Sequence, residues 1–118
     1  MANYTKITAE GRYLDGVSMG FIKVENEAKN IYLDIKVWYY ETRTSWGHKA
    51  EICGHYGDNY VSKHDFKNIY YNRTWENYRF QSVLHRAFYE CGLSKKIDKK
   101  EYDALWEKID QKCKEARF

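Results

Sequence analysis

The hydrophobic pattern of this chain changes its period once, and this change constrains the fold more than any other feature. Over residues 31–42 apolar side chains alternate with polar or aromatic ones, and the apolar positions are Ile31, Leu33, Ile35 and Val37. A period of two is typical of a β-strand with one buried face. From residue 80 onward apolar residues recur every three or four positions, as in an amphipathic helix. The pattern therefore predicts strands first and helices afterwards.

Residues 1–70 are predicted to be mainly β-structure. Two short β-prone runs precede the central strand, and the polar run "NEAKN" connects them to it, so a hairpin or meander is expected. The run "TRTSWG" predicts a turn that places Trp46 in a loop, and residues 48–57 predict a returning strand. Residues 58–69 show no regular period, and either a short strand or a helical turn fits them.

Two helices are predicted, over residues 73–91 and 98–116. Asn72 or Thr74 would cap the first helix, and Gly92 would end it in a left-handed conformation. The second helix begins with the pattern of a capping box, in which Asp98 is the cap and Glu101 the reciprocal partner. Its apolar stripe consists of Tyr102, Leu105, Trp106, Ile109, Cys113 and Ala116.

These elements predict a single α+β domain over residues 1–118. An N-terminal antiparallel sheet of three to five strands is packed on one face by the two C-terminal helices. The odd residues of the central strand would contact the helices, and the even ones would point to solvent on the other face. Exposed aromatic residues in a row form an apolar patch, and such patches usually contact another molecule.

The overall composition indicates a soluble protein of the reducing cytoplasm. The formal net charge is only +3, which gives a weak long-range field, and the three cysteines form no CxxC pair. The N-terminal run is too polar for a signal peptide, and no apolar run approaches the roughly 20 residues that span a bilayer. We expect no membrane association, while the oligomeric state stays open, a dimer included.

The residues that most often carry catalysis or bind metals do not form a recognisable site here. His48, Cys53, His55 and His64 are close in sequence but lack the paired spacing of zinc ligands. Glu51, Cys53 and His55 alternate on one predicted strand, a composition that many strands contain by chance. We therefore expect no enzyme, no metal and no cofactor.

Two kinds of partner remain. Aromatic and basic residues on a sheet face are typical of single-stranded nucleic-acid binding, and Tyr, Trp and Arg are also the residues that dominate protein interfaces. The basic residues of the second helix alternate with acidic ones, which is typical of a solvated helix face. Under either hypothesis the candidate partner-binding residues are Tyr32, Lys36, Trp38, Tyr40, Arg43, Trp46, Arg73, Arg79 and Arg86.

The run "YYNRTWENYRFQSVLHRAF", residues 70–88, resembles a pattern in small uncharacterised proteins of phages and mobile elements of low-GC bacteria. An Asn-Arg-Thr-Trp-Glu run is followed by an aromatic residue and then by Gln-Ser-Val. The resemblance covers about 19 residues and carries no catalytic role. It implies a non-catalytic protein that acts in the host cytoplasm by binding and inhibiting a host protein or ribonucleoprotein, such as a CRISPR effector or another defence nuclease. The alternative is a small single-stranded nucleic-acid-binding protein.

Overall fold

The computed structural model describes residues 5–14, 17–41, 43, 46–68 and 79–116. Five strands come first: β1 (Lys6–Leu14), β2 (Val17–Asn26), β3 (Ile31–Glu41), β4 (Trp46–Tyr56) and β5 (Asn59–Asn68). Three helices follow: α1 (Arg79–Glu90), α2 (Leu93–Lys96) and α3 (Lys99–Ala116). The predicted α+β fold, with strands first and helices afterwards, is confirmed.

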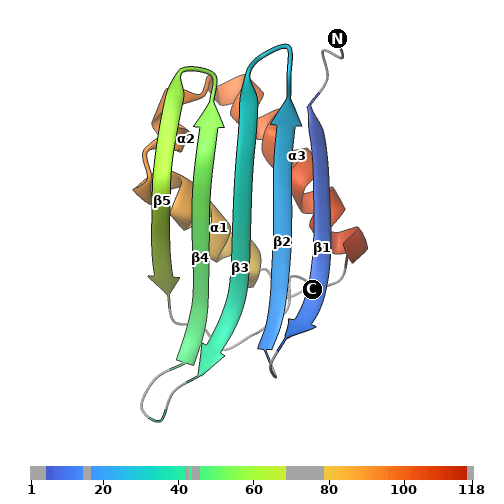
Figure 1. The fold of residues 1–118 in the computed structure, drawn as a ribbon, viewed down its shortest axis with the longest axis vertical. Coiled ribbons are helices and arrows are strands. Elements are labelled where there is room, and N and C mark those ends of the chain that lie inside the picture. Colours follow the sequence, from blue (N-terminus) through green and yellow to red (C-terminus); the bar gives the residue numbers. More distant parts are fainter. Residues whose placement is uncertain (1–4, 15–16, 42, 44–45, 69–78, 117–118) are drawn as a thin grey trace.

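The strands form one antiparallel sheet in the order β1-β2-β3-β4-β5, so each strand pairs with its neighbours in sequence. All the helices that the structure describes lie behind the same face of this meander, and they leave the other face uncovered (Figure 1). The strand with the clearest alternation, β3, is central as predicted. The C-terminal helices divide the covered face, because α1 packs on β3, β4 and β5 and α3 packs on β1.

The core lies between the sheet and the helices. The odd residues of β3 from Ile31 to Val37 are buried, and Ile22 and Ile52, which pair with Ile35 on β2 and β4, are fully buried too. The two longer helices contribute their apolar stripes, here Leu84, Ala87, Phe88, Leu105, Trp106, Ile109 and Cys113. The Phe88 and Trp106 rings meet edge to face with centroids 5.3 Å apart, and this contact joins α1 to α3.

The helix boundaries follow the predicted signals where the structure describes them. Gly92 has a φ of +88°, and its N–H donates to the Tyr89 carbonyl, as expected for a glycine after the end of a helix. The single turn α2 was not predicted, and it lies between α1 and α3. The proposed caps Asn72 and Thr74 lie outside the described residues.

One prediction about the sheet was wrong: Trp46 is the first residue of β4, paired with Glu41, so it does not lie in a loop. For residues 58–69 the sequence left a short strand or a helical turn open, and the structure has a strand there, β5. Among the described strands β5 pairs with β4 alone, through a register shift at Ile52 and Gly54. An edge strand with an irregular register does not show a strict alternation of two, since a bulge moves later side chains to the other face.

Gly54 is the residue that this irregularity requires. Its φ is +127°, and a Cβ at this position would lie 2.1 Å from the Tyr32 carbonyl oxygen on the neighbouring strand. Residues that have a side chain rarely adopt this backbone conformation. The carbonyl oxygen that the Cβ would clash with belongs to the backbone of the neighbouring strand, which cannot move without breaking the hydrogen bonds between the strands.

We therefore expect Gly54→Ala to lower the free energy of unfolding by roughly 2 to 4 kcal/mol, because strain and overpacking add. Gly57→Ala is the matched control: its φ is +62° but no atom lies within 4 Å of the added Cβ, so it should cost about 1 kcal/mol. Urea denaturation measures both. Equal losses for the two variants would contradict the close approach at Gly54.

Candidate functional site

The candidate site is the sheet face that the helices leave uncovered. The even residues of β3 from Tyr32 to Trp38 lie on it, and the strand register aligns each of them with one residue of β2 and one of β4. Tyr32 aligns with Glu25 and His55, and Trp38 aligns with Met19 and Lys49. We call this surface the open face. Its side chains stand in rows that run across the strands.

One row of the open face is aromatic. Tyr32 on β3, His55 on β4 and Tyr60 on β5 are directly aligned. The rings of Tyr32 and His55 have centroids 6.4 Å apart, and those of His55 and Tyr60 5.5 Å apart. Tyr32 is 40% exposed and Tyr60 75% exposed. Aligned rings on adjacent strands support one another and still present their faces and edges to solvent.

The middle ring of this row is fixed by a backbone hydrogen bond. The His55 Nδ1 atom lies 2.9 Å from the carbonyl oxygen of Asn30, in the turn between β2 and β3. Because a carbonyl can only accept, the Nδ1 atom carries the proton that is donated in this contact. The same carbonyl accepts from the Gly57 N–H at 3.0 Å, so two turns of the sheet are tied together beside the row.

The middle of the open face combines rings with charged groups. The Arg12 guanidinium lies 5.0 Å from the centre of the Phe21 ring and forms two hydrogen bonds with Glu10, at 2.9 and 3.0 Å. Phe21 aligns with Lys36, and the hollow between these residues has a volume of about 360 Å³. Trp38 is half-buried beside them. Cation–π contact and a paired carboxylate hold Arg12 in place at the surface.

Opposite charges alternate across the open face. Lys6 aligns with Glu25, Lys23 with Asp34, and Lys36 with Glu51. Such cross-strand pairs are worth only about 0.2 to 1 kcal/mol each, but they nearly cancel the charge of the surface. The open face therefore offers a pattern of alternating charges and no uniform positive field.

The structure distributes the predicted site residues over two sides of the molecule. Tyr32, Lys36 and Trp38 lie on the open face, and Arg43 is exposed in the connection between β3 and β4. The side chains of Tyr40, Trp46 and Arg79 and the whole of Arg73 lie outside the described part of the chain.

Arg86 does not belong to the open face. It is exposed on α1, behind the sheet, and its Nε donates to Glu90 at 3.2 Å. One flat partner surface cannot contact Arg86 and Trp38 together.

Sequence reasoning missed His55 and Tyr60 as members of the site. His55 was considered only as a metal ligand or a catalytic base, and Tyr60 lies in the segment without a regular pattern. Their alignment with Tyr32 depends on the register of three strands, so no local pattern reveals it.

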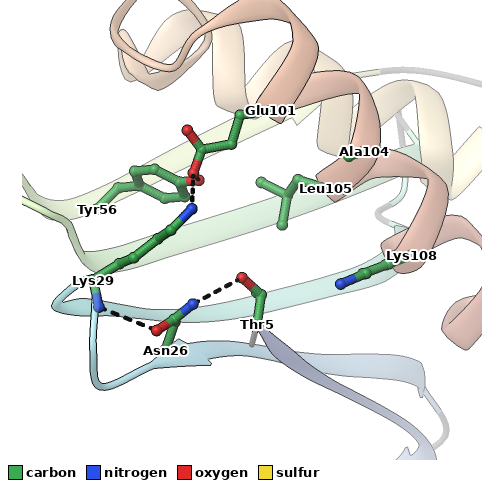
Figure 2. Close-up of a pocket in the computed structure, with 8 residues that line it drawn as sticks. All are labelled: Thr5, Asn26, Lys29, Tyr56, Glu101, Ala104, Leu105 and Lys108. Carbon is green, nitrogen blue, oxygen red and sulfur yellow. Dashed lines mark hydrogen bonds and ion pairs between the residues drawn. The ribbon is translucent and has the colours of Figure 1, made fainter. Parts of the chain in front are cut away.

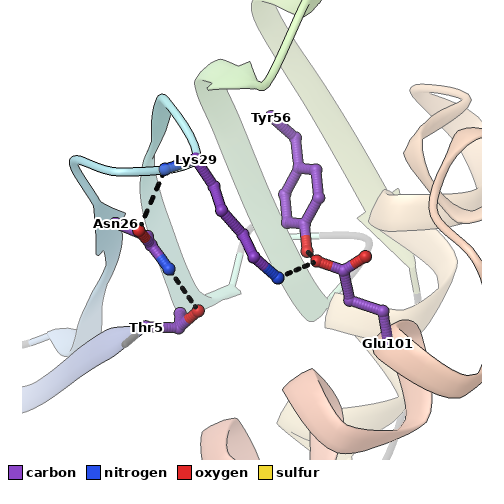
Figure 3. Close-up of polar contacts among 5 residues, drawn as sticks. All are labelled: Thr5, Asn26, Lys29, Tyr56 and Glu101. Carbon is purple, nitrogen blue, oxygen red and sulfur yellow. Dashed lines mark hydrogen bonds and ion pairs between the residues drawn. The ribbon is translucent and has the colours of Figure 1, made fainter. Parts of the chain in front are cut away.

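A second concave region lies where the sheet meets α3. It has a volume of about 280 Å³, and Figure 2 shows Thr5, Asn26, Lys29, Tyr56 and Glu101 among the side chains around it. Tyr56 donates a 2.5 Å hydrogen bond to Glu101 Oε1, and Lys29 donates to the same oxygen at 3.3 Å (Figure 3). Glu101 was predicted to complete a capping box, and its Oε1 instead accepts from the sheet.

The electrostatics of this cluster indicate a structural clamp. Burial and the hydrogen bond to Glu101 raise the pKa of Tyr56, so its proton stays in place at neutral pH. The hydrogen bond from Tyr56, with Lys29 nearby, lowers the pKa of Glu101. A phenol that keeps its proton beside a fixed carboxylate is a poor acid or base for catalysis. The cluster ties α3 to β4 and to the turn between β2 and β3.

Two of the three cysteines are held as thiols by burial. Burial raises the pKa of the Cys113 thiol and that of the Cys91 thiol, which disfavours the thiolate that a nucleophile needs. In the ranges that the structure describes, no group of three or more His, Cys, Asp or Glu residues is placed to hold a metal ion.

The clamp predicts a pH-dependent contribution to stability. Because the pKa of Glu101 is lowered in the folded protein, its stabilisation is complete above the unfolded pKa of about 4.3 and is lost as the pH falls through the lower folded value. Tyr56→Phe should lower the free energy of unfolding by about 1 kcal/mol at pH 7 and by less below pH 4. The loss is this small because Glu101 is partly exposed. Thermal denaturation at pH 7 and pH 3 measures this difference. Tyr60→Phe is the control, and an equal loss at both pH values would contradict the role of the carboxylate.

Comparisons with known proteins identify no relative. No protein-family model, no curated protein and no solved structure matches this chain. Among the helices that the structure describes, none combines the length and the apolar character needed to cross a bilayer.

Proposed function

We propose that this chain is a non-catalytic binding protein whose open face docks onto another protein. The observation that carries this proposal is the row of Tyr32, His55 and Tyr60, aligned on three strands and exposed to solvent. Rigid aromatic side chains provide large contact areas at a small cost in conformational entropy, which is why they dominate protein interfaces. The fixed position of the His55 ring means that the row needs little rearrangement on binding.

The charges of the open face favour a protein partner over a nucleic acid. A chain of phosphates is bound by a surface on which cations predominate. Here Lys6, Lys23 and Lys36 each align with a carboxylate. A protein surface with the opposite alternation of charges complements this pattern, and complementarity of this kind provides specificity and a fixed orientation.

The class of partner follows from the sequence resemblance. The run in residues 70–88 is similar to one found in small phage and mobile-element proteins. Proteins of this kind that lack a catalytic centre act stoichiometrically, by covering a functional surface of a host protein. A host defence nuclease in the cytoplasm, such as a CRISPR effector, is the partner we propose.

A crosslinking experiment tests the surface. A photoreactive phenylalanine analogue at position 60 should crosslink a bacterial protein in lysates of low-GC hosts, and the same analogue at position 89 should not. Tyr89 is the matched control because it is also an exposed tyrosine, 54% exposed, but lies on α1 behind the sheet.

The affinity of the captured protein then measures the contribution of the row. We expect the double variant Tyr32→Ala, Tyr60→Ala to weaken binding at least about tenfold, and Tyr89→Ala to leave it unchanged. Calorimetry at two salt concentrations should give similar affinities. Salt-sensitive binding to any oligonucleotide, with no protein captured, would favour the nucleic-acid alternative. A double variant that binds as well as the wild type would contradict the assignment of the open face.

A further inference from the structure

A second surface, separate from the open face, lies between the outer edge of the sheet and α3. The strand β1 is at one end of the strand order, and α3 packs against it and extends past its outer edge (Figure 1). Between them is a groove with a volume of about 770 Å³. Its size is in the range of about 300 to 1,000 Å³ that is usual for ligand sites.

One side of this groove is the backbone of an edge strand. Four consecutive residues, Thr5 to Thr8, line the groove. Since side chains of a strand alternate between its two faces, consecutive lining residues mean that the backbone itself forms this wall. The strand β1 pairs with β2, and no strand in the described ranges pairs with its other edge. Every second residue of such an edge presents an N–H and a C=O that have no partner in the sheet. These groups are the donors and acceptors that an additional strand would use.

The other side of the groove is a face of α3. Ala104, Lys108 and Gln111 lie along it, and Figure 2 shows Ala104 and Lys108 on the side of the helix that faces Thr5. Ile7, which is 5% exposed, and Ala104 together form the apolar floor of the groove. A side chain of an added strand that points toward the helix would be covered by this floor.

The charged groups around the groove are mainly basic. Lys6, Lys108 and Lys112 line it, against the single carboxylate of Glu107. Within the part of the chain that the structure describes, none of these three lysines forms an ion pair. Lys6 is also aligned with Glu25 on β2, so Lys108 and Lys112 on α3 carry the positive charge of the groove that no carboxylate in the described ranges pairs.

We propose that the groove binds an extended, acidic segment of a partner protein, which adds to β1 as a sixth strand. Backbone hydrogen bonds to the free edge of β1 would provide affinity for any extended chain. Alternate side chains would point toward α3, where small apolar residues fit over Ile7 and Ala104 and carboxylates fit beside Lys108 and Lys112. This inference does not depend on the proposed function of the open face, because the aromatic row of Tyr32, His55 and Tyr60 lies outside the groove.

The charges also distinguish this occupant from a second copy of the same chain. Two copies that paired through β1 would be related by a two-fold axis, and each would bring the same basic groove to the contact. Lys108 and Lys112 of one copy would then lie close to those of the other, and like charges at an interface oppose association. A partner with carboxylates has the opposite effect.

Selection from a displayed library of random ten-residue peptides tests the proposal with the full chain as bait. We expect enrichment of sequences that alternate Asp or Glu with β-branched residues. Amide chemical shifts on adding the best peptide should change in residues 5–8 and along α3. The charge-reversal variant Lys108→Glu, Lys112→Glu should weaken that peptide at least about tenfold. Lys100→Glu, an exposed lysine of the same helix outside the groove, should change its affinity less than about twofold.

Backbone methylation of the peptide separates strand addition from simple charge attraction. N-methyl groups on one set of alternate residues should abolish binding and those on the other set should not, since only every second N–H faces β1.

The proposal is overturned if no acidic sequence is enriched, if both methylated peptides bind like the parent, or if Lys100→Glu weakens binding as much as the double variant. A chain dimer in sedimentation that the double variant abolishes would place a second copy in the groove and would also overturn it. The variant Tyr32→Ala, Tyr60→Ala should bind the peptide normally, so a failure of one surface is distinguishable from a failure of the other.

Discussion

The shared register of the strands is the constraint on which the rest of this structure depends. Ile22, Ile35 and Ile52 are aligned across β2, β3 and β4, and all three are fully buried under the helices. Since side chains alternate along each strand, this alignment also determines what stands on the other face. The aromatic row and the alternating charges follow from the same register. A slip of one residue in any strand would exchange buried and exposed side chains along its length.

The sequence predicted the parts of this arrangement that depend on local periodicity. The alternation in β3 predicted which of its residues contact the helices, and Gly92 marked the end of α1. Both signals come from residues close together in the chain, where propensity and pattern act directly. The predicted placement of Tyr32, Lys36 and Trp38 on the open face follows from the same alternation.

The parts that the sequence did not reveal depend on contacts between distant residues. The strand β5 has a polar composition and joins the sheet through an irregular register, so its own pattern is weak. Glu101 has the local signal of a capping residue, yet Tyr56, 45 positions away, determines where its carboxylate points. His55 becomes part of an aromatic row only because β3 and β5 lie on either side of it. In each case tertiary context outweighs the local preference.

The contact between α3 and β1 joins the last and the first of the described elements, and this has a consequence during synthesis. A meander makes its strand pairs locally, so β1 to β5 can pair as they leave the ribosome. Ile7, which is buried in the finished domain, stays uncovered until α3 has emerged. The nascent sheet therefore exposes an apolar strip for the time needed to translate the intervening residues. Chaperones that recognise such strips would meet this chain before it is complete.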